Sequence, residues 1–361
     1  MIRRRETRQV RVGQLTLGGN APVRIQSMTN TFTRDVAATV AQIDQLTGAG
    51  CEIVRVACAV EEDARALGKI KARIQVPLVA DIHFSHRFAL IALEEGVDKL
   101  RINPGNIGSR DRIEEVVLKA KERKIPIRIG INSGSLEKDL MEKYGPTPEA
   151  MVESAKRQIR ILEDMGFSDT VISLKSSDVP AMIQAYRLAS QTFDYPLHLG
   201  VTEAGTLLRG SVYSAVGLGT LLQEGIGDTL RVSLTADPVE EVKVAKMILE
   251  ALELKECVRV ISCPTCGRAE IDVVKLAREV EDRAMKLKGP LTISVMGCSV
   301  NGPGEAHRSD FGITGGKDKG MIYIDGKQLR VVDEKDLVDE LFKEIEKRRE
   351  LSGAAGKFDI P

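Results

Sequence analysis

The chain has 361 residues, and its 52 basic side chains are balanced by 52 acidic ones, which argues against a nucleic-acid-binding or membrane-surface protein with its usual basic excess. Aromatic residues make up only 4% of the chain and tryptophan is absent, so we expect no stacking platform for single-stranded nucleic acid. The sequence contains neither a run of 18 or more apolar residues nor a signal peptide, so we expect a cytoplasmic protein with no membrane partner and with reduced cysteines.

Residues 8–19 alternate between polar and apolar side chains, a pattern typical of a hairpin. After them, short runs rich in β-branched residues alternate with longer amphipathic segments. The short runs predict strands at Val23–Thr29, Ile53–Cys58, Leu78–Phe84, Lys99–Asn103, Ile125–Asn132, Val171–Ser176, Leu197–Thr202 and Leu230–Leu234. The longer segments predict helices that include Asp35–Ala49, Ile113–Lys121, Pro148–Met165, Pro180–Thr192 and Val239–Leu252. About eight such repeats predict an α/β fold, with a closed (β/α)8 TIM barrel over residues 1–255 as the substrate-binding domain.

The pattern changes after Leu254, and residues 256–361 predict a smaller α+β domain. Its expected elements are a helix at Ile271–Leu287, a strand at Leu291–Val295, a glycine-rich hairpin at Gly312–Val332 and a charged helix at Glu334–Glu350. Two cysteine-containing loops lie among these elements, and we expect this domain to hold a metal centre.

The candidate metal ligands are three cysteines and one carboxylate. Ser262–Arg268 contains a Cys-x-x-Cys pair, and Met296–Glu305 adds a third cysteine and the acid. A close pair fixes two ligands at small entropic cost, and three thiolates with one harder oxygen ligand suit a cluster with one distinct iron. The four residues are Cys263, Cys266, Cys298 and Glu305.

Two other interpretations of the cysteines remain. A redox-active disulfide normally opens a helix, whereas Pro264 and Gly267 indicate a loop, which disfavours it. Zinc is the serious alternative, with His307 completing a Cys3His set, and spacing alone does not separate zinc from a cluster.

Polar residues recur where the predicted barrel strands end, the part of a TIM barrel that forms active sites. Residues two apart on a strand share a face, so neighbouring polar residues on one strand point together. The candidate substrate-binding residues are Arg55, Asp81, His83, Arg101, Asn103, Arg128, Asn132, Lys175, His198, Arg231 and Ser233, and Glu203 follows the seventh strand.

Cations outnumber acids in this set. A single strand arginine more often pairs with a nearby acid, so the inference rests on recurrence at equivalent positions of successive strands. A buried excess of cations is costly unless an anion neutralises it, and arginine forks fit phosphate oxygens. The sequence therefore predicts a diphosphate-bearing small molecule as the ligand. The cations are Arg55, Arg101, Arg128, Lys175 and Arg231, against the carboxylates Asp81 and Glu203.

Several stretches resemble the 4-hydroxy-3-methylbut-2-enyl diphosphate synthase family, the iron–sulfur enzymes of the non-mevalonate isoprenoid pathway, in their bacterial two-domain form. The resemblance extends over nearly the whole chain, and the two cysteine-containing stretches are its most specific part. The matching stretches are Gln26–Thr29, Asp81–Phe84, Arg101–Gly105, His198–Gly205, Ser262–Arg268 and Gly297–Glu305.

The resemblance implies a [4Fe–4S] cluster held by Cys263, Cys266, Cys298 and Glu305. It implies reductive ring opening of 2-C-methyl-D-erythritol 2,4-cyclodiphosphate to (E)-4-hydroxy-3-methylbut-2-enyl diphosphate, with electrons from flavodoxin or ferredoxin. It also implies a homodimer in which one subunit's cluster domain closes over the other's barrel. In our hypothesis Glu203 donates the proton to the departing oxygen, while His83 and His198 orient the substrate.

Two other functions are compatible with parts of the sequence. The first is a redox-silent barrel lyase or transferase for a phosphorylated substrate, with zinc on the C-terminal cysteines; a colourless rather than a brown protein would indicate it. The second is an electron-transfer or scaffold-type iron–sulfur module without a substrate, which leaves the predicted cations at the barrel mouth unexplained.

Overall fold

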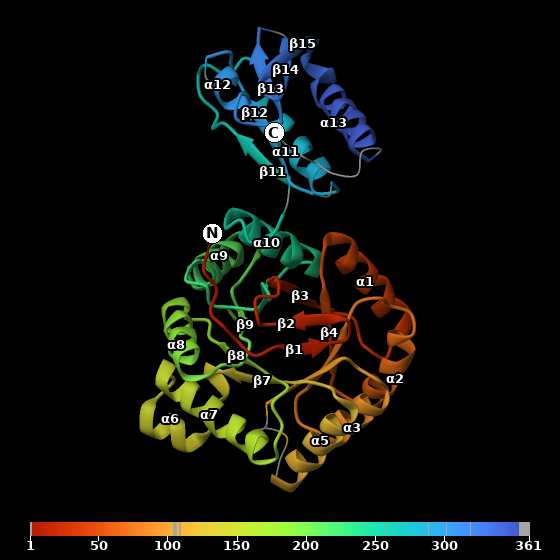
Figure 1. Ribbon diagram of the computed structural model, residues 1–361, viewed down its shortest axis with the longest axis vertical. Coiled ribbons are helices and arrows are strands. Elements are labelled where there is room, and N and C mark those ends of the chain that lie inside the picture. Colours follow the sequence, from red (N-terminus) through yellow and green to blue (C-terminus); the bar gives the residue numbers. More distant parts are fainter. Residues whose placement is uncertain are drawn as a thin grey trace. The chain divides into compact units, whose positions relative to one another are not determined.

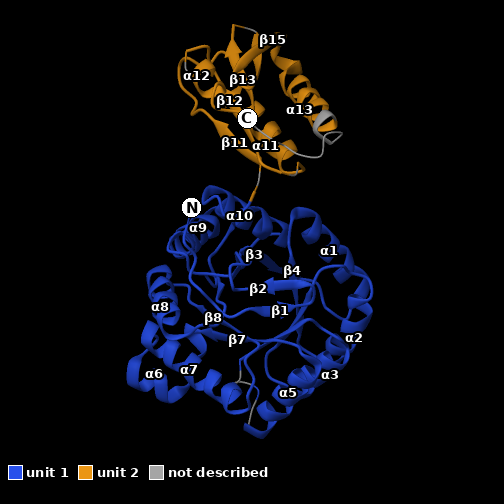
Figure 2. Cartoon of the chain, viewed as in Figure 1, with its two compact units in different colours: residues 1–255 blue, residues 256–361 orange. Residues whose placement is uncertain are grey.

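The computed structural model describes residues 2–103, 107, 110–256, 258–287, 289–300, 302–317 and 319–353. Pro104, Gly105 and Asn301, which belong to the motifs quoted above, lie outside the described residues. The chain divides into two compact units, residues 1–255 and residues 256–361 (Figure 2). Each unit has its own hydrophobic core of buried side chains.

The first unit is an eight-stranded parallel barrel, as the repeats predicted. The strands pair in the order β8-β7-β6-β5-β4-β3-β10-β9, and a parallel bridge between Ile172 and Leu197 joins the two ends of that order. The barrel therefore closes on itself and places all strand carboxyl ends at one rim. The strands are β3 (Arg24–Met28), β4 (Ile53–Cys58), β5 (Leu78–Ile82), β6 (Lys99–Ile102), β7 (Ile127–Asn132), β8 (Thr170–Lys175), β9 (His198–Leu199) and β10 (Thr229–Leu230).

Helices surround the barrel strands (Figure 1). Several begin at side-chain caps: Asp35, Thr147, Asp178 and Asp237 each accept a backbone N–H of the first turn. In the last three of these helices a proline follows the cap within two residues, where its missing N–H costs nothing. The helices are α1 (Val36–Ala49), α2 (Glu61–Lys71), α3 (His86–Glu94), α5 (Arg110–Arg123), α6 (Lys138–Tyr144), α7 (Pro148–Asp164), α8 (Val179–Thr192), α9 (Leu207–Gln223) and α10 (Pro238–Ala251).

The predicted N-terminal hairpin is formed by β1 (Val10–Val12) and β2 (Leu15–Leu17), which pair antiparallel. Its apolar side chains share a buried cluster with Ile53 and Val79, which lie early in their strands, and with Val171. The hairpin therefore packs against the amino ends of the strands and leaves the opposite rim to the polar residues.

The second unit is a five-stranded sheet with helices, in the order β11-β12-β13-β14-β15. The first three strands are parallel and the last two antiparallel. The expected hairpin at Gly312–Val332 is wrong in detail, because this stretch has two turns and forms three strands. The elements are β11 (Val258–Ser262), α11 (Val273–Ala284), β12 (Leu291–Met296), α12 (Gly302–Ala306), β13 (Phe311–Gly316), β14 (Lys319–Ile324), β15 (Lys327–Asp333) and α13 (Leu337–Gly353).

Candidate functional site

The predicted strand residues point into the barrel. Asp81, Arg101 and Arg128 are register partners on β5, β6 and β7, and residues paired in this way face the same side of a parallel sheet. All three are buried. Arg55 on β4 and Lys175 on β8 are also buried. The strand alternation read from the sequence therefore has the correct phase at these positions.

Asp81 is the centre of the described charges on one side of the barrel. Its carboxylate lies 3.1 Å from Arg101 Nη1, 3.6 Å from Arg55 Nε and 3.8 Å from His83 Nε2. Burial alone would raise the pKa of Asp81, but attraction from the cations, first Arg55 and then Arg101, outweighs it and lowers the pKa to about 2. One carboxylate thus pairs with two arginines and neutralises only part of their positive charge.

Arg231 pairs with an acid that the sequence analysis missed. Its Nε and Nη2 lie 3.0 and 2.9 Å from the carboxylate of Glu241, near the start of α10. Glu241 is buried and also accepts a hydrogen bond from Ser27 Oγ at 2.9 Å. The only signal for it was an acid in the first turn of a helix, which normally indicates a helix-dipole contact rather than a barrel residue.

Among the described residues, Arg128 and Lys175 form no salt bridge, unlike Arg55, Arg101 and Arg231. Arg128 is 1% exposed, and its Nε and Nη1 have no hydrogen-bond partner among the described residues. Burial and then repulsion, from Arg55 first, lower the pKa of Arg128 and of Lys175 well below their ordinary values. Lys99 on β6, which the sequence analysis did not select, is fully buried in the same way, and burial followed by repulsion from Arg128 lowers its pKa.

The other predicted polar residues are spread over different depths of the barrel. Asn103 directly follows β6 and is buried, while Asn132 ends β7 in register with Lys175. Ser233 lies half-buried beyond β10. Glu203 is exposed in the loop after β9, with φ of 53°, a conformation that non-glycine residues seldom adopt.

His198 differs from these residues because it is fully buried within β9 rather than placed at the rim. Its Nδ1 lies 2.8 Å from Thr229 Oγ1, and Nε2 has no partner among the described residues. Burial and then repulsion, from Arg128 first, lower the pKa of His198 well below its ordinary value, so the ring is neutral at physiological pH.

The two cysteine loops follow adjacent strands. β11 and β12 run parallel with Ser262 opposite Val295, so Cys263 and Cys298 follow the carboxyl ends of two adjacent strands, at the same end of the sheet. The Gly297 N–H donates to Cys263 Sγ at 3.2 Å, an N–H on sulfur of the kind that stabilises thiolate ligands. Cys298 is buried, and Cys266 is exposed.

The fourth candidate ligand, Glu305, lies in α12, which begins four residues after Cys298. The Cys298 carbonyl accepts the Gly302 N–H at 3.2 Å and so ties the start of α12 to the cysteine loop. Among the described residues, no three His, Cys, Asp or Glu side chains are gathered closely enough to hold a single metal ion. A four-iron cluster instead binds each ligand at a separate iron.

His307 is not placed to complete a zinc site with Cys298. A Cβ added at Gly326, in the turn between β14 and β15, would lie 2.8 Å from His307 Nδ1. A Cβ added at Gly315 would instead lie 2.2 Å from the Gly297 carbonyl, next to Cys298. Gly326 follows the end of β14 that pairs with Phe311, so His307 and the cysteines lie at opposite ends of β13.

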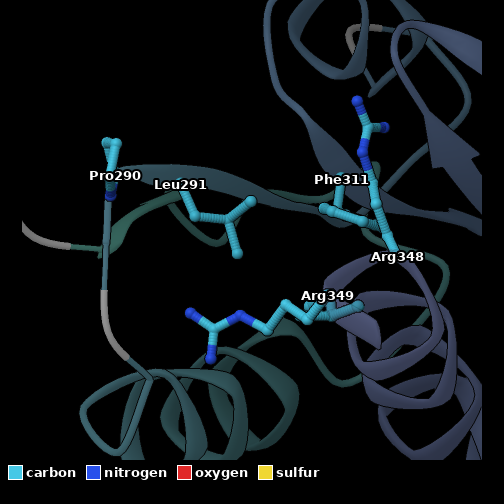
Figure 3. Close-up of a pocket in the computed structure, with 6 residues that line it drawn as sticks. Pro290, Leu291, Phe311, Arg348 and Arg349 are labelled. Carbon is cyan, nitrogen blue, oxygen red and sulfur yellow. The ribbon is translucent and has the colours of Figure 1, made fainter. Parts of the chain in front are cut away.

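A small surface hollow lies elsewhere in the second unit (Figure 3). Leu291 and Phe311, the first residues of β12 and β13, line it together with Arg348 and Arg349 of α13. Because the cysteines follow the opposite ends of the strands, this hollow contains none of the candidate ligands.

The fold and the barrel interior define a TIM-barrel enzyme with an added α+β domain. The GcpE TIM-barrel domain family matches residues 7–246, and the GcpE protein C-terminal domain matches residues 259–347. The chain belongs to the GcpE family, as the resemblance predicted. Among the described residues, no helix is long and apolar enough to cross a membrane.

Close relatives share this assignment. A protein of Geobacillus thermodenitrificans (strain NG80-2) named "4-hydroxy-3-methylbut-2-en-1-yl diphosphate synthase (flavodoxin)" is 58% identical over 352 residues, covering 97% of this chain and 94% of the relative. A protein of Clostridium perfringens with the same name is 58% identical and covers 96% and 99%. Type I 3-dehydroquinate dehydratase from Clostridium difficile, a solved structure with 16% identity and a TM-score of 0.51, covers 68% of this chain and 98% of its own, and shows the barrel fold alone.

Proposed function

We propose that the protein catalyses the reductive ring opening and dehydroxylation of 2-C-methyl-D-erythritol 2,4-cyclodiphosphate to (E)-4-hydroxy-3-methylbut-2-enyl diphosphate, a step of non-mevalonate isoprenoid synthesis. The observation that carries the proposal is the excess of buried cations inside the barrel. Two buried carboxylates, Asp81 and Glu241, face four arginines there, with the amine of Lys175 beside them. A diphosphate supplies the missing negative charge, and arginine forks bind its oxygens in pairs.

We propose that the substrate's phosphates are bound by Arg55, Arg101, Arg128, Lys175 and Arg231, with Asn103, Asn132 and Ser233 as neutral donors. Asp81 orients the first two arginines, because its carboxylate lies within 3.6 Å of both. His83, 3.8 Å from Asp81, and the neutral His198 then orient the rest of the substrate.

We propose a [4Fe–4S] cluster bound by Cys263, Cys266, Cys298 and Glu305. When bound, it supplies electrons and a Lewis acid for the leaving oxygen, which a redox-silent barrel lacks. The residues fit such a group, since the two cysteine loops begin at the same end of the sheet and the Gly297 N–H points at Cys263 Sγ. Carboxylate is a harder and more exchangeable ligand than thiolate, so Glu305 would be the most readily exchanged of the four ligands.

Anaerobic purification followed by iron, sulfide and zinc analysis tests this assignment. We expect a brown protein with iron and sulfide and an absorbance spectrum that changes when the cyclic diphosphate is added. Cys298→Ser should lose the visible absorbance, while Cys58→Ser, which changes a buried thiol of the barrel, should keep it. Zinc in place of iron, or an unchanged spectrum in Cys298→Ser, would contradict the ligand assignment.

We propose Glu203 as the proton donor to the departing oxygen, because it lies exposed at the rim after β9. Glu203→Gln keeps the size of the side chain and removes the transferable proton. This variant should keep its iron content and its affinity for inorganic pyrophosphate, and its turnover should fall at least about a hundred-fold. Turnover at the normal rate would remove this role from Glu203.

We propose that flavodoxin or ferredoxin delivers the electrons, since the relatives' names contain flavodoxin. We also propose a cytoplasmic homodimer. The cysteines described as free fit a reducing compartment. The exposed apolar face of α9 supports a second copy, with Leu208, Val212 and Val216 exposed at successive turns.

A further inference from the structure

Met28 lies between two of the barrel arginines. It ends β3 in register with Arg55 of β4, so both side chains face the barrel interior. The thioether sulfur lies 3.1 Å from Arg55 Nε, 3.0 Å from Arg55 Nη2 and 3.6 Å from Arg231 Nη1. One sulfur atom therefore accepts N–H groups from two guanidinium groups, at a point where a carboxylate would be the usual acceptor.

The contacts form a continuous row across the interior. Asp81 lies 3.6 Å from Arg55 on one side, and Glu241 binds Arg231 at 2.9 Å on the other. Met28 occupies the middle of this row. Both ends of the row carry negative charge, whereas the middle acceptor carries none.

A thioether is a weak, polarisable acceptor, and it cannot neutralise a cation. A carboxylate at this position would hold the two arginines more tightly but would cancel the charge that a diphosphate needs. Leucine would have a similar size but would remove the acceptor of three partly buried N–H groups, which would then be free to turn away. Methionine thus orients the two guanidinium groups and leaves their positive charge in place.

We infer that Met28 is a positioning residue of the diphosphate site, whose neutral sulfur holds Arg55 and Arg231 in a binding geometry without cancelling their charge. This role rests on the proposed function, since it needs an anionic ligand in the barrel. In this role the sulfur accepts the N–H groups that a ligand oxygen would otherwise accept.

The test is calorimetric titration of the full chain with inorganic pyrophosphate, using three variants of Met28. Met28→Gln keeps a neutral acceptor, Met28→Leu keeps only the apolar volume, and Met28→Glu adds a charge. We expect Gln to bind within about three-fold of the parent, Leu to bind about ten-fold more weakly, and Glu about a hundred-fold more weakly. With the cyclic diphosphate, Met28→Leu should raise KM more than it lowers kcat.

A purely packing role predicts a different order, with Leu equal to Met and both Gln and Glu impaired. Met182→Leu is the matched control, because Met182 is a fully buried methionine of α8 in the barrel core, and its affinity for pyrophosphate should stay unchanged. If Met28→Leu binds pyrophosphate as tightly as the parent, the proposed role of Met28 is wrong, while the anion site itself stands. If Met28→Gln does not fold, the comparison of Met28→Leu with the parent decides the question by itself. No binding by the parent would overturn the anion site and the inference together.

Discussion

At the scale of single residues, the unpaired amine of Lys175 makes ligand binding depend on protons. Burial and nearby cations lower its pKa in the free protein, whereas a bound diphosphate would stabilise the ammonium and raise that pKa. Between the two pKa values the free amine is neutral and the bound amine is charged. Binding must therefore take up protons in this pH window.

We predict an uptake of up to about one proton when inorganic pyrophosphate binds at a pH between the lowered pKa of the free amine and the higher pKa of the bound ammonium. Titration calorimetry in buffers with different ionisation enthalpies measures it as a slope of the observed enthalpy. Lys175→Met should lose most of the uptake, whereas Lys246→Met, on the outer helix α10, should keep it. Equal uptake in Lys175→Met and the parent would show that another group takes the proton.

The sequence predicted the barrel cations because strand alternation is a local property that fixes which face each residue occupies. It did not predict Glu241, Lys99 or the role of Met28. Glu241 reaches Arg231 from a helix ten residues further along the chain, and which helix residue turns inward depends on packing. Met28 looks like an ordinary core residue until its two arginine neighbours are known.

At the scale of elements, one position of β7, Gly130, must lack a side chain so that Arg101 of β6 can lie against the β7 backbone. A Cβ added at Gly130 would stand 2.6 Å from Arg101 Nε, too close for the present side-chain position. Gly200 is restricted in the same way, since its added Cβ would lie 2.6 Å from Lys175 Nζ. These glycines make room for cations rather than for a turn.

We predict that Gly130→Ala will weaken pyrophosphate binding about ten-fold, because Arg101 must move away from its place beside Asp81. The melting temperature should change little, since the displaced group is the flexible end of a side chain. Gly134→Ala is the matched control, because an added Cβ there meets nothing within 4 Å. Unchanged affinity in Gly130→Ala would mean that the position of Arg101 does not matter for the anion.

The number and order of elements were predictable, but their ends were not. The seventh and eighth barrel strands were expected at Leu197–Thr202 and Leu230–Leu234. The strands found are His198–Leu199 and Thr229–Leu230, so two residues of the first range and one of the second are in a strand. Glu203 and Ser233 therefore lie in loops. Val201 and Val232, beyond the strand ends, are still fully buried, so hydrophobicity alone could not mark the boundary.

At the scale of the whole molecule, the exposed side of α9 is the surface that we propose to join two copies of the chain. α9 has one charged residue, Arg209, in seventeen, and exposes Leu208, Val212 and Val216 along one side. An outer helix of a TIM barrel normally exposes charged residues there. A repeated apolar stripe of this kind favours an interface with a second copy over solvent.

We predict that Val212→Lys will shift the proposed homodimer to monomer at micromolar concentration, because a charge at the centre of an apolar interface must be buried without a partner. Sedimentation velocity over a dilution series measures the change. Leu118→Lys is the control, because Leu118 is equally exposed, at 59% against 52%, but lies on α5 away from this stripe, and it should leave the dimer intact. If the Val212 variant remains dimeric, the subunits meet through another surface; if the parent is monomeric at all concentrations, the proposed homodimer is wrong.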